Sequence, residues 1–457
     1  MHDVCVNIHL SPKEPHGSSI PQVSLAWQTI VTTVANAAAR TSSFIRRQRQ
    51  VTGAGFVQAL VFGFLAHPQA TLEQLAQSAA NVGITISPQG LEQRCTEAAA
   101  TCLQQVLEAA VQQVVAAKSV AVPILQRFNG VYLLDSTTIT LPDALASVWQ
   151  GCGGSTVGSA AALKVQVLWN FSTGALRAVG LQDGRASDQR APVQAVVLPP
   201  GALRIADLGY FSLDQIAAAQ AQGSFVLSRW YPQTALFAPD GTPLDLLRVL
   251  REQAQPTLDW DVLLGSKQRV PMRLLAVRVP QEVADQRRRR IRKEARDTGR
   301  PVSAHLLALA EWTICVTTVP RAQLTVAEAL VLLRVRWQIE LLFKLWKSQG
   351  QVDTSRSQQP WRILCEVYAK LLAMIVLHWV LLMSCWQDAD RSLPKAAQTV
   401  QGHALALGAA VSHGSAVLTT QLERIGRCIG AGCRINPRKK RPNTYQLLLA
   451  LSDEPLS

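Results

Sequence analysis

Three acidic residues lie in segments whose neighbours are mostly apolar. Asp135 interrupts "YLLDSTT", Asp207 follows an apolar run in "RIADLGY", and Glu340 lies in "RWQIELLFKLWK". Asp is disfavoured in strands and is costly to bury without partners. Three carboxylates from separate elements are the oxygen ligands that Mg²⁺ or Mn²⁺ requires. Two such ions can activate a water or a 3′-hydroxyl and stabilise the leaving oxygen in a phosphoryl displacement.

Each acid also has an ordinary structural interpretation. A strand-end Asp that caps the next turn suits Asp207, which has Gly209 nearby, better than it suits Asp135. Glu340 belongs to a helix predicted over 332–350. Its charged positions are Arg336, Glu340, Lys344 and Lys347, and its apolar face is Leu332, Val335, Ile339, Leu342 and Trp346. A solvated ladder of such pairs contributes only a few tenths of a kcal/mol per pair.

Hydrophobic periodicity predicts the elements that would position these acids. From residue 131 the pattern alternates with a period of two, which indicates strands. The predicted elements are strands at 131–141, 162–171 and 175–181, a short helix at 187–197, a strand at 203–210, a helix at 212–223, and strands at 225–230 and 311–319. This order predicts an α/β core with Asp135 and Asp207 on strands and Glu340 on a helix.

Composition and turn signals divide the chain into six segments. We expect a disordered N-terminus (1–23), a helical domain (24–127), the first part of the core (128–230), an inserted segment (231–310), the second part of the core (311–350), and a helical C-terminal region with a basic tail (351–457). The inserted segment contains turns, a strand-like "MRLLAVRV" and the arginine run at 287–290. That run is either a solvated helix face or a contact for DNA phosphates.

Within the helical domain, residues 72–94 predict two helices separated by Gly83, with Ser87 as the N-cap of the second and Pro88 at its first position. The pair is either a DNA-binding helix-turn-helix or an ordinary helical hairpin, and Arg94 is the only basic residue on its second helix. The upstream basic residues Arg46, Arg47 and Arg49 could touch phosphates or form a solvated turn.

The overall charge favours a polyanionic partner. The 457 residues include 45 Lys and Arg against 31 Asp and Glu, a net charge of +14, which suits nucleic acid or an acidic membrane surface. Nine scattered cysteines without a C-x-x-C motif argue against structural zinc and disulfides. No secretory signal is recognisable, so we expect a cytoplasmic protein. The apolar stretches 51–68 and 371–386 predict buried core helices, the second being too short to span a membrane.

The acidic motifs together resemble a known family. "LLDSTT", "IADLGYF" and "RWQIELLFKLWK" look like the three acidic motifs of DDE transposases of bacterial insertion sequences, specifically the insertion-sequence-4 family. The signature of that family around its third acid is Y-x-x-R-x-x-x-E-x-x-x-x-x-x-K. Arg336, Glu340 and Lys347 match it, whereas Leu333 occupies the tyrosine position. The resemblance spans roughly residues 70–385 and implies an RNase H-like core with a mixed sheet.

The resemblance also implies roles for individual residues. Asp135, Asp207 and Glu340 would bind two Mg²⁺ or Mn²⁺ ions. The side chains implied to contact DNA are Arg336, Lys344, Lys347, Arg229 and Trp312. Arg229 is similar to a DNA-contacting arginine, and Trp312 lies where hairpin-forming relatives hold a tryptophan that takes up a flipped base. The alternative for Trp312 is an ordinary core residue.

The implied activity is cut-and-paste transposition. The partners would be double-stranded DNA, both terminal inverted repeats and target, and a second copy of the chain in the DNA complex, without a membrane. A bacterial, nucleoid-associated location follows from that substrate. Two alternatives remain: a metal-dependent RNase H-like nuclease without strand transfer, and a non-catalytic helix-turn-helix regulator.

Overall fold

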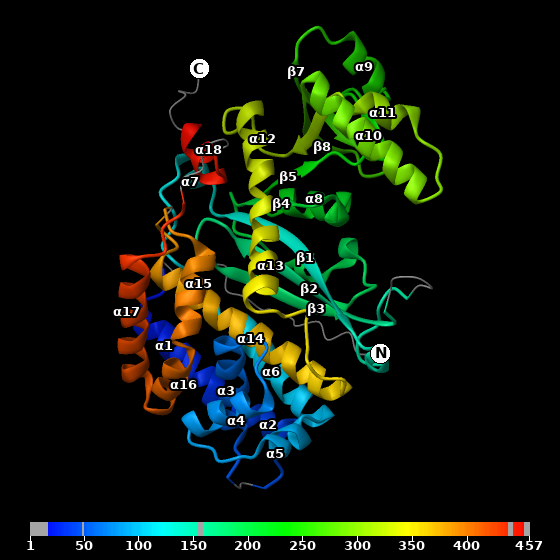
Figure 1. Cartoon of the computed structure of the whole chain (residues 1–457). Helices are drawn as coiled ribbons and strands as arrows, with labels where there is room; N and C mark the ends of the chain where they lie inside the picture. The colour runs from blue at the N-terminus through cyan, green and yellow to red at the C-terminus, as the bar shows by residue number, and fades with distance from the viewer. Residues whose placement is uncertain (1–16, 48–49, 154–158, 389, 437–441, 452–457) are drawn as a thin grey trace.

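The computed structural model describes residues 17–47, 50–153, 159–388, 390–436 and 442–451. A helical body forms one end of the molecule, and a sheet with its covering helices forms the rest (Figure 1). Most of the N-terminus predicted to be disordered (1–16), Arg49 and the basic tail at 437–441 lie outside the described residues. Within the described part, the first helix already begins at Ile20, inside the segment predicted to be disordered.

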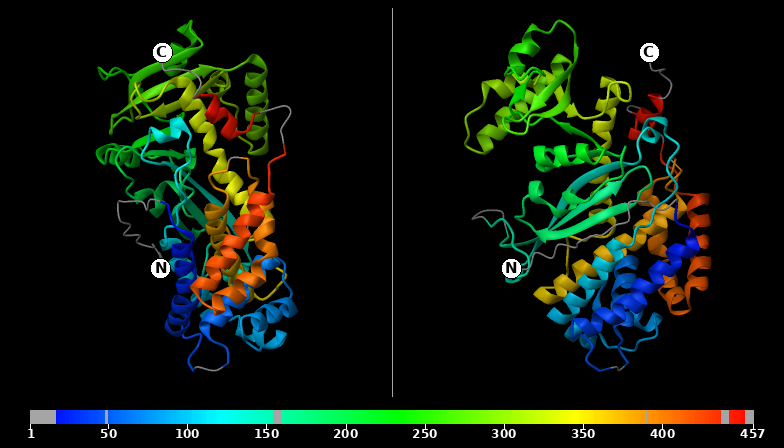
Figure 2. Two further views of the ribbon diagram at one scale, coloured as in Figure 1. Left: turned by 90° about the vertical axis from the view of Figure 1, so that its left-hand side faces the viewer. Right: turned by 180° about the vertical axis from the view of Figure 1, so that it is seen from behind.

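The helical body combines segments from both ends of the chain. From the N-terminal part come α1 (Ile20–Thr29), a π-helical turn (Ile30–Val34), α2 (Ala35–Thr41), α3 (Gly53–Ala66), α4 (Leu72–Asn81), α5 (Pro88–Arg94), α6 (Glu97–Gln112) and α7 (Pro123–Gln126). From the C-terminal part come α14 (Pro360–Ser384), α15 (Leu393–Gly402), α16 (Ala404–Ser412) and α17 (Ser415–Ala431). Helix α14 packs against α3, α6 and α17, so the two predicted helical regions surround one central helix (Figure 2).

Helix α14 is longer than the sequence pattern predicted. With 25 residues it is long and apolar enough to cross a membrane, but 89% of its most apolar window is buried inside the protein. Its polar His378 is buried too, and a ring nitrogen pairs with the carbonyl of Gly174 at 2.7 Å. The prediction of a core helix is therefore confirmed, and only its predicted length was wrong.

Within the described residues, the sheet has nine strands in the order β3-β2-β1-β4-β5-β9-β8-β7-β6. The strands are β1 (Val131–Leu141), β2 (Ala161–Asn170), β3 (Leu176–Asp183), β4 (Leu203–Ala206), β5 (Phe225–Arg229), β6 (Leu236–Phe237), β7 (Thr257–Leu264), β8 (Val270–Arg278) and β9 (Trp312–Thr317). Strands β1, β2 and β3 are antiparallel, whereas β4 and β5 run parallel to β1. The mixed α/β core expected from the sequence is confirmed.

Two predicted elements differ in the structure. Residues 187–197 form two 3₁₀ turns, Asp188–Arg190 and Pro192–Ala195, and no α-helix. Proline disfavours the helical conformation at the residue before it, and Ala191 is extended with φ −62° and ψ 127°. The strand predicted to run to residue 210 ends at Ala206, so Asp207 lies just beyond its end.

The inserted segment continues the sheet. Strands β6, β7 and β8 join the core through β9 in an antiparallel arrangement, and β7 was not predicted. The helices of the segment are α9 (Leu246–Glu252), α10 (Gln281–Asp297) and α11 (Ala304–Leu309). Leu258, Val262 and Leu264 of β7 lie in a hydrophobic cluster that also includes Trp312. The segment thus extends one edge of the core and shares a hydrophobic cluster with residues of β5 and β9.

Two consecutive helices cross the sheet beside β1. They are α12 (Val326–Val335) and α13 (Trp337–Gln349), separated at Arg336, where one continuous helix was predicted. The apolar residues predicted to face the core are all buried: Leu332, Val335, Ile339, Leu342 and Trp346. The remaining helices are α8 (Leu213–Ala221), after the second acid, and α18 (Thr444–Ala450), which packs on α12.

Candidate active site

Asp135 and Asp207 follow the last paired residues of two neighbouring parallel strands. The pairing of β1 with β4 ends with Leu134 opposite Ala206. Asp135 directly follows Leu134 in the sequence, and Asp207 directly follows Ala206. Beyond this point β1 pairs only with β2, so the strand has an open side where polar side chains can lie. Strand β4 ends at this point while β1 continues to Leu141, and the parallel register of the two strands places the two aspartates side by side.

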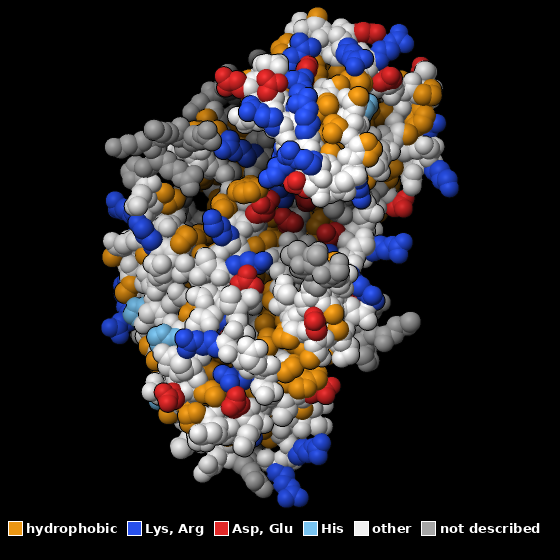
Figure 3. All heavy atoms as spheres, turned by 45° about the vertical axis from the view of Figure 1, so that its right-hand side comes forward, with side chains coloured by type: hydrophobic (Ala, Val, Ile, Leu, Met, Phe, Trp, Pro, Cys, Tyr) orange, Lys and Arg blue, Asp and Glu red, His pale blue; other side chains and the backbone are white. Residues whose placement is uncertain are grey.

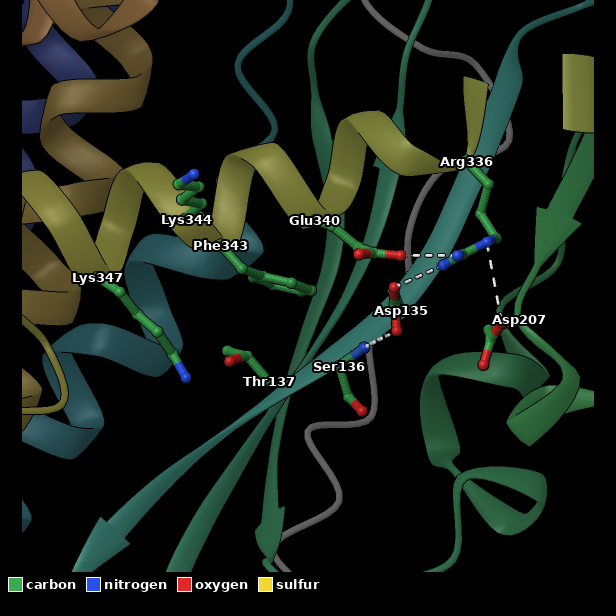
Figure 4. Close-up of a pocket in the computed structure, with 9 residues that line it drawn as sticks. All are labelled: Asp135, Ser136, Thr137, Asp207, Arg336, Glu340, Phe343, Lys344 and Lys347. Carbon is green, nitrogen blue, oxygen red and sulfur yellow. Dashed lines mark hydrogen bonds and ion pairs between the residues drawn. The ribbon is translucent and has the colours of Figure 1, made fainter. Parts of the chain in front are cut away.

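Glu340 reaches the same edge from α13, which packs against β1. Burial of Ile339 and Leu342 fixes the rotation of this helix about its axis. Glu340 then faces Asp135 (Figure 4). Arg336 lies one helical turn before Glu340 and contacts all three acids (Figure 4). Its guanidinium nitrogens lie 3.0 Å from an oxygen of Asp135, 2.6 Å from Glu340 and 3.8 Å from Asp207.

The charges of this cluster do not balance, because one guanidinium faces three carboxylates. Burial raises the pKa of Asp135 to about 6, and the negative charges of Asp207 and Glu340 act in the same direction. The backbone N–H of Ser136, which donates to Asp135 at 2.8 Å, and the charge of Arg336 lower the pKa of Asp135 but do not offset burial. The cluster therefore favours an additional positive charge.

The acids form one end of a pocket of about 470 Å³. Its residues are Asp135, Ser136, Thr137, Asp207, Arg336, Glu340, Phe343, Lys344 and Lys347. The ammonium group of Lys347 donates to the carbonyl of Thr138 at 3.2 Å and lies 3.8 Å from Asp353. Lys344 is exposed at the pocket. The structure thus brings six of the eight predicted site residues into one pocket.

The other two predicted residues lie outside that pocket. Arg229 is exposed at the end of β5, and its charge acts on Arg287 of the inserted segment. Trp312 is only 5% exposed, and the guanidinium of Arg278 lies 4.7 Å from its ring centroid. In this arrangement Trp312, on β9, is buried in the hydrophobic cluster that the core shares with the inserted segment, and a flipped base could reach its ring only if neighbouring side chains moved.

Sequence reasoning missed a polar network beside the acids. Asp188 accepts hydrogen bonds from Lys164 at 3.1 Å, Ser136 at 3.4 Å and Gln166 at 3.4 Å. Lys164 and Gln166 are buried on β2, and their alternation in an otherwise apolar strand was the available signal. Because Ser136 follows Asp135 and Asp188 lies against Gly209, this network connects the segments that carry the two aspartates.

The side chains fit a divalent cation by their chemistry. Three carboxylates are hard oxygen donors, they share the guanidinium of Arg336, and burial, assisted by the charges of Asp207 and Glu340, raises the pKa of Asp135. As placed, no group of three His, Cys, Asp or Glu side chains within the described ranges is close enough to hold one ion. Binding would therefore require side-chain movement within the Arg336 cluster.

Comparisons with known proteins identify the family of the chain. The family described as "Transposase DDE domain" matches residues 126–376. The chain is 25% identical over 360 residues to the transposase for insertion sequence element IS231F of Bacillus thuringiensis subsp. israelensis, which covers 74% of this chain and 75% of that protein. It is 23% identical over 439 residues to the IS231B transposase of B. thuringiensis subsp. berliner, covering 90% and 91%. A putative transposase, InsL for IS186A of Escherichia coli K12, is 30% identical over 185 residues, covering 38% and 50%.

Proposed function

The chain belongs to the DDE transposases of the insertion-sequence-4 type, and we propose that Asp135, Asp207 and Glu340 are its three catalytic acids. The supporting observation is their convergence on Arg336 from the middle of β1, the end of β4 and helix α13. A DDE transposase requires a divalent metal, and we assign the three carboxylates as its ligands, with two Mg²⁺ or Mn²⁺ ions. Such ions supply the Lewis acidity that activates a nucleophilic oxygen and stabilises a leaving oxygen.

The protein side chains would then bind and orient the DNA. Lys344 and Lys347 line the pocket beyond the acids and would hold phosphates next to the cleaved bond. Arg336 would keep the carboxylates together until metal arrives and then share their charge with it. Phe343 would form an apolar wall of the pocket that limits access of water. Arg229 would contact DNA further along the sheet.

Transposition adds requirements that one chain does not meet alone. Two DNA ends are cut and joined, so we propose a dimer in the DNA complex. The helical segment 24–127 would bind the terminal repeats through α4 and α5, where Ser87 caps α5 as predicted and accepts from Gly90 at 3.1 Å. DNA as the substrate implies a cytoplasmic, nucleoid-associated location.

Cleavage of the DNA that flanks the gene encoding this protein, where the terminal repeats would lie, tests this proposal. Linear DNA with both flanks should be cut at two positions by the purified protein with Mg²⁺ or Mn²⁺, and left intact with EDTA. A target plasmid should then acquire the excised DNA, whereas a nuclease would release ends without joining them. Cutting without joined products would show a nuclease that does not transfer DNA strands. Binding without any cutting would favour a non-catalytic regulator.

A further inference from the structure

The arginine-rich helix α10 has two faces with different partners. Its inner face includes the buried Ala284 and is held against the core by two arginines. Arg287 donates to the carbonyl of Trp312 and to the hydroxyl of Thr313, both at 2.9 Å. Arg288 pairs with Asp285 at 2.9 Å and also with Glu311. Half of the 287–290 run is therefore structural, because it attaches α10 to β9.

The outer face carries a second set of cations. Arg289, Arg292, Lys293 and Arg296 occur at i, i+3, i+4 and i+7, a spacing that places them on one side of a helix. We call these four residues the basic stripe. All four are exposed, and among the described residues none forms an ion pair with a carboxylate. Arg289 donates to the carbonyl of Asp285 at 3.4 Å, its one hydrogen bond within the described residues.

Four neighbouring cations without acidic partners repel one another, since like charges one helical turn apart are destabilising. The repulsion is relieved when a polyanion binds. From Arg289 to Arg296 the stripe extends about 10 Å along the helix axis. One strand of duplex DNA presents a phosphate about every 3.4 Å of its axis, so the stripe matches about three successive phosphates.

The position of α10 suits a DNA duplex that enters the active site. Helices α10 and α13 lie on the same side of the sheet, with α10 further out on the inserted segment (Figures 1 and 2). A space-filling view shows Lys and Arg side chains over the inserted segment, above a hollow that contains acidic side chains (Figure 3). DNA that reaches the acids therefore has a basic surface to follow.

We propose that the basic stripe of α10 binds the phosphate backbone of duplex DNA outside the cleavage site, independently of sequence. This inference rests on the proposed function for the identity of its partner. Arg287 and Arg288 do not take part, because their donors are already used within the protein. The stripe contributes affinity and orientation, and the terminal sequence is recognised elsewhere.

The experiment compares two double variants that each remove two positive charges from the inserted segment. Arg292→Gln/Arg296→Gln removes half of the stripe. Arg248→Gln/Arg251→Gln on α9 is the matched control, where Arg248 already pairs with Glu252 at 3.0 Å. Gln and Arg have similar helix propensities, so neither helix should be disturbed. Binding of a fluorescent DNA duplex of unrelated sequence is measured between about 50 and 200 mM salt.

The stripe variant should bind this duplex about tenfold more weakly at low salt, with a log–log salt slope reduced by about 1.8, or 0.9 for each lost phosphate contact. The control variant should retain the affinity and slope of the unaltered protein. Equal slopes for the two variants, or an unchanged slope in both, would overturn the proposal and leave the stripe as a solvated helix face. Because the probe needs no cleavage, a failure of the proposed catalytic function would appear separately, as uncut flanking DNA.

Discussion

Two ion pairs with the same helical spacing lie in different regions of this protein. Arg336–Glu340 lies at the pocket, whereas Glu366–Lys370 lies within α14 in the helical body. Both pairs are formed by residues four apart. Their surroundings differ: the side chain of Glu340 is 31% exposed, while those of Lys370 and Glu366 are 1% and 6% exposed.

The buried pair is balanced and fully bonded. Lys370 lies 2.8 Å from Glu366 and also donates to the carbonyls of Gln351 at 3.1 Å and Thr354 at 2.8 Å. Glu366 accepts from the hydroxyl of Ser355 at 2.6 Å. The pair therefore fastens the loop after α13 to the helical body. A buried pair with these bonds needs no further partner.

The ion pair at the pocket is not balanced in charge, and it is partly exposed to solvent. Arg336 is shared among three carboxylates, and burial raises the pKa of Asp135 to about 6. Such an arrangement costs stability in the isolated protein and is offset when cations bind. An uncompensated charge, and not the ion pair as such, therefore distinguishes the pocket from a structural contact.

Loss of a pocket acid should have the largest effect. On the proposed function, Glu340→Gln should lower the rate of DNA cleavage by at least about 10³-fold, or about 4 kcal/mol, because one of the three proposed metal ligands would be lost. Affinity for the same DNA should change little, since binding rests on basic groups. Glu294→Gln on α10 is the control for loss of an exposed acid. Cleavage by Glu340→Gln at the normal rate would remove Glu340 from the site.

Breaking the buried pair should affect stability instead. Lys370→Met leaves Glu366 buried without its cation and should lower the free energy of unfolding by about 3–5 kcal/mol, measured in urea. The double variant Glu366→Met/Lys370→Met should recover part of this loss, because it leaves no unpaired charge. A loss below about 1 kcal/mol in the single variant would show that the pair is not a structural fastening.

The pH dependence of the free energy of unfolding should reveal the raised pKa of Asp135. The pKa of Asp135 is raised from 3.8 to about 6 in the folded protein, so the folded state favours the neutral acid. Its contribution to stability is present below about pH 4 and is lost as the pH rises through about 6. In EDTA at pH 8, Asp135→Asn should therefore raise the free energy of unfolding, by up to about 3 kcal/mol. The same substitution should change little at pH 4, and a destabilised variant at pH 8 would contradict this sign.

Removal of the shared cation should have a smaller effect on chemistry. Arg336→Ala should lower cleavage by at least about tenfold, or about 1.4 kcal/mol, because the acids lose the group that holds them together. Arg334→Ala, an exposed arginine on the preceding turn, is the matched control. Equal cleavage rates for the two variants would show that Arg336 forms only an ordinary surface ion pair along its helix.

Local sequence pattern was enough to predict much of the fold and to single out the three candidate acids. The alternation of residues 131–141 predicted β1 with its observed bounds, and the position of Asp135 within it was the first sign of a site. The apolar face of 332–350 predicted the orientation of the helix that carries Glu340, and its break at Arg336 was not visible in the pattern. The family resemblance came from these same motifs and agrees with the match over 126–376.

The sequence by itself determined which segments form helices and strands and which of their residues share a face, because helical and strand periodicity depend on near neighbours along the chain. Only the tertiary structure decided which of them meet. Leu134 pairs with Ala206 across strands, and this long-range register brings Asp135 beside Asp207. Likewise, Arg287 donates to the carbonyl of Trp312, whereas Arg296 forms no ion pair with a carboxylate in the described part of the chain. These differences arise from contacts between segments far apart in sequence, and periodicity carries no information about such contacts.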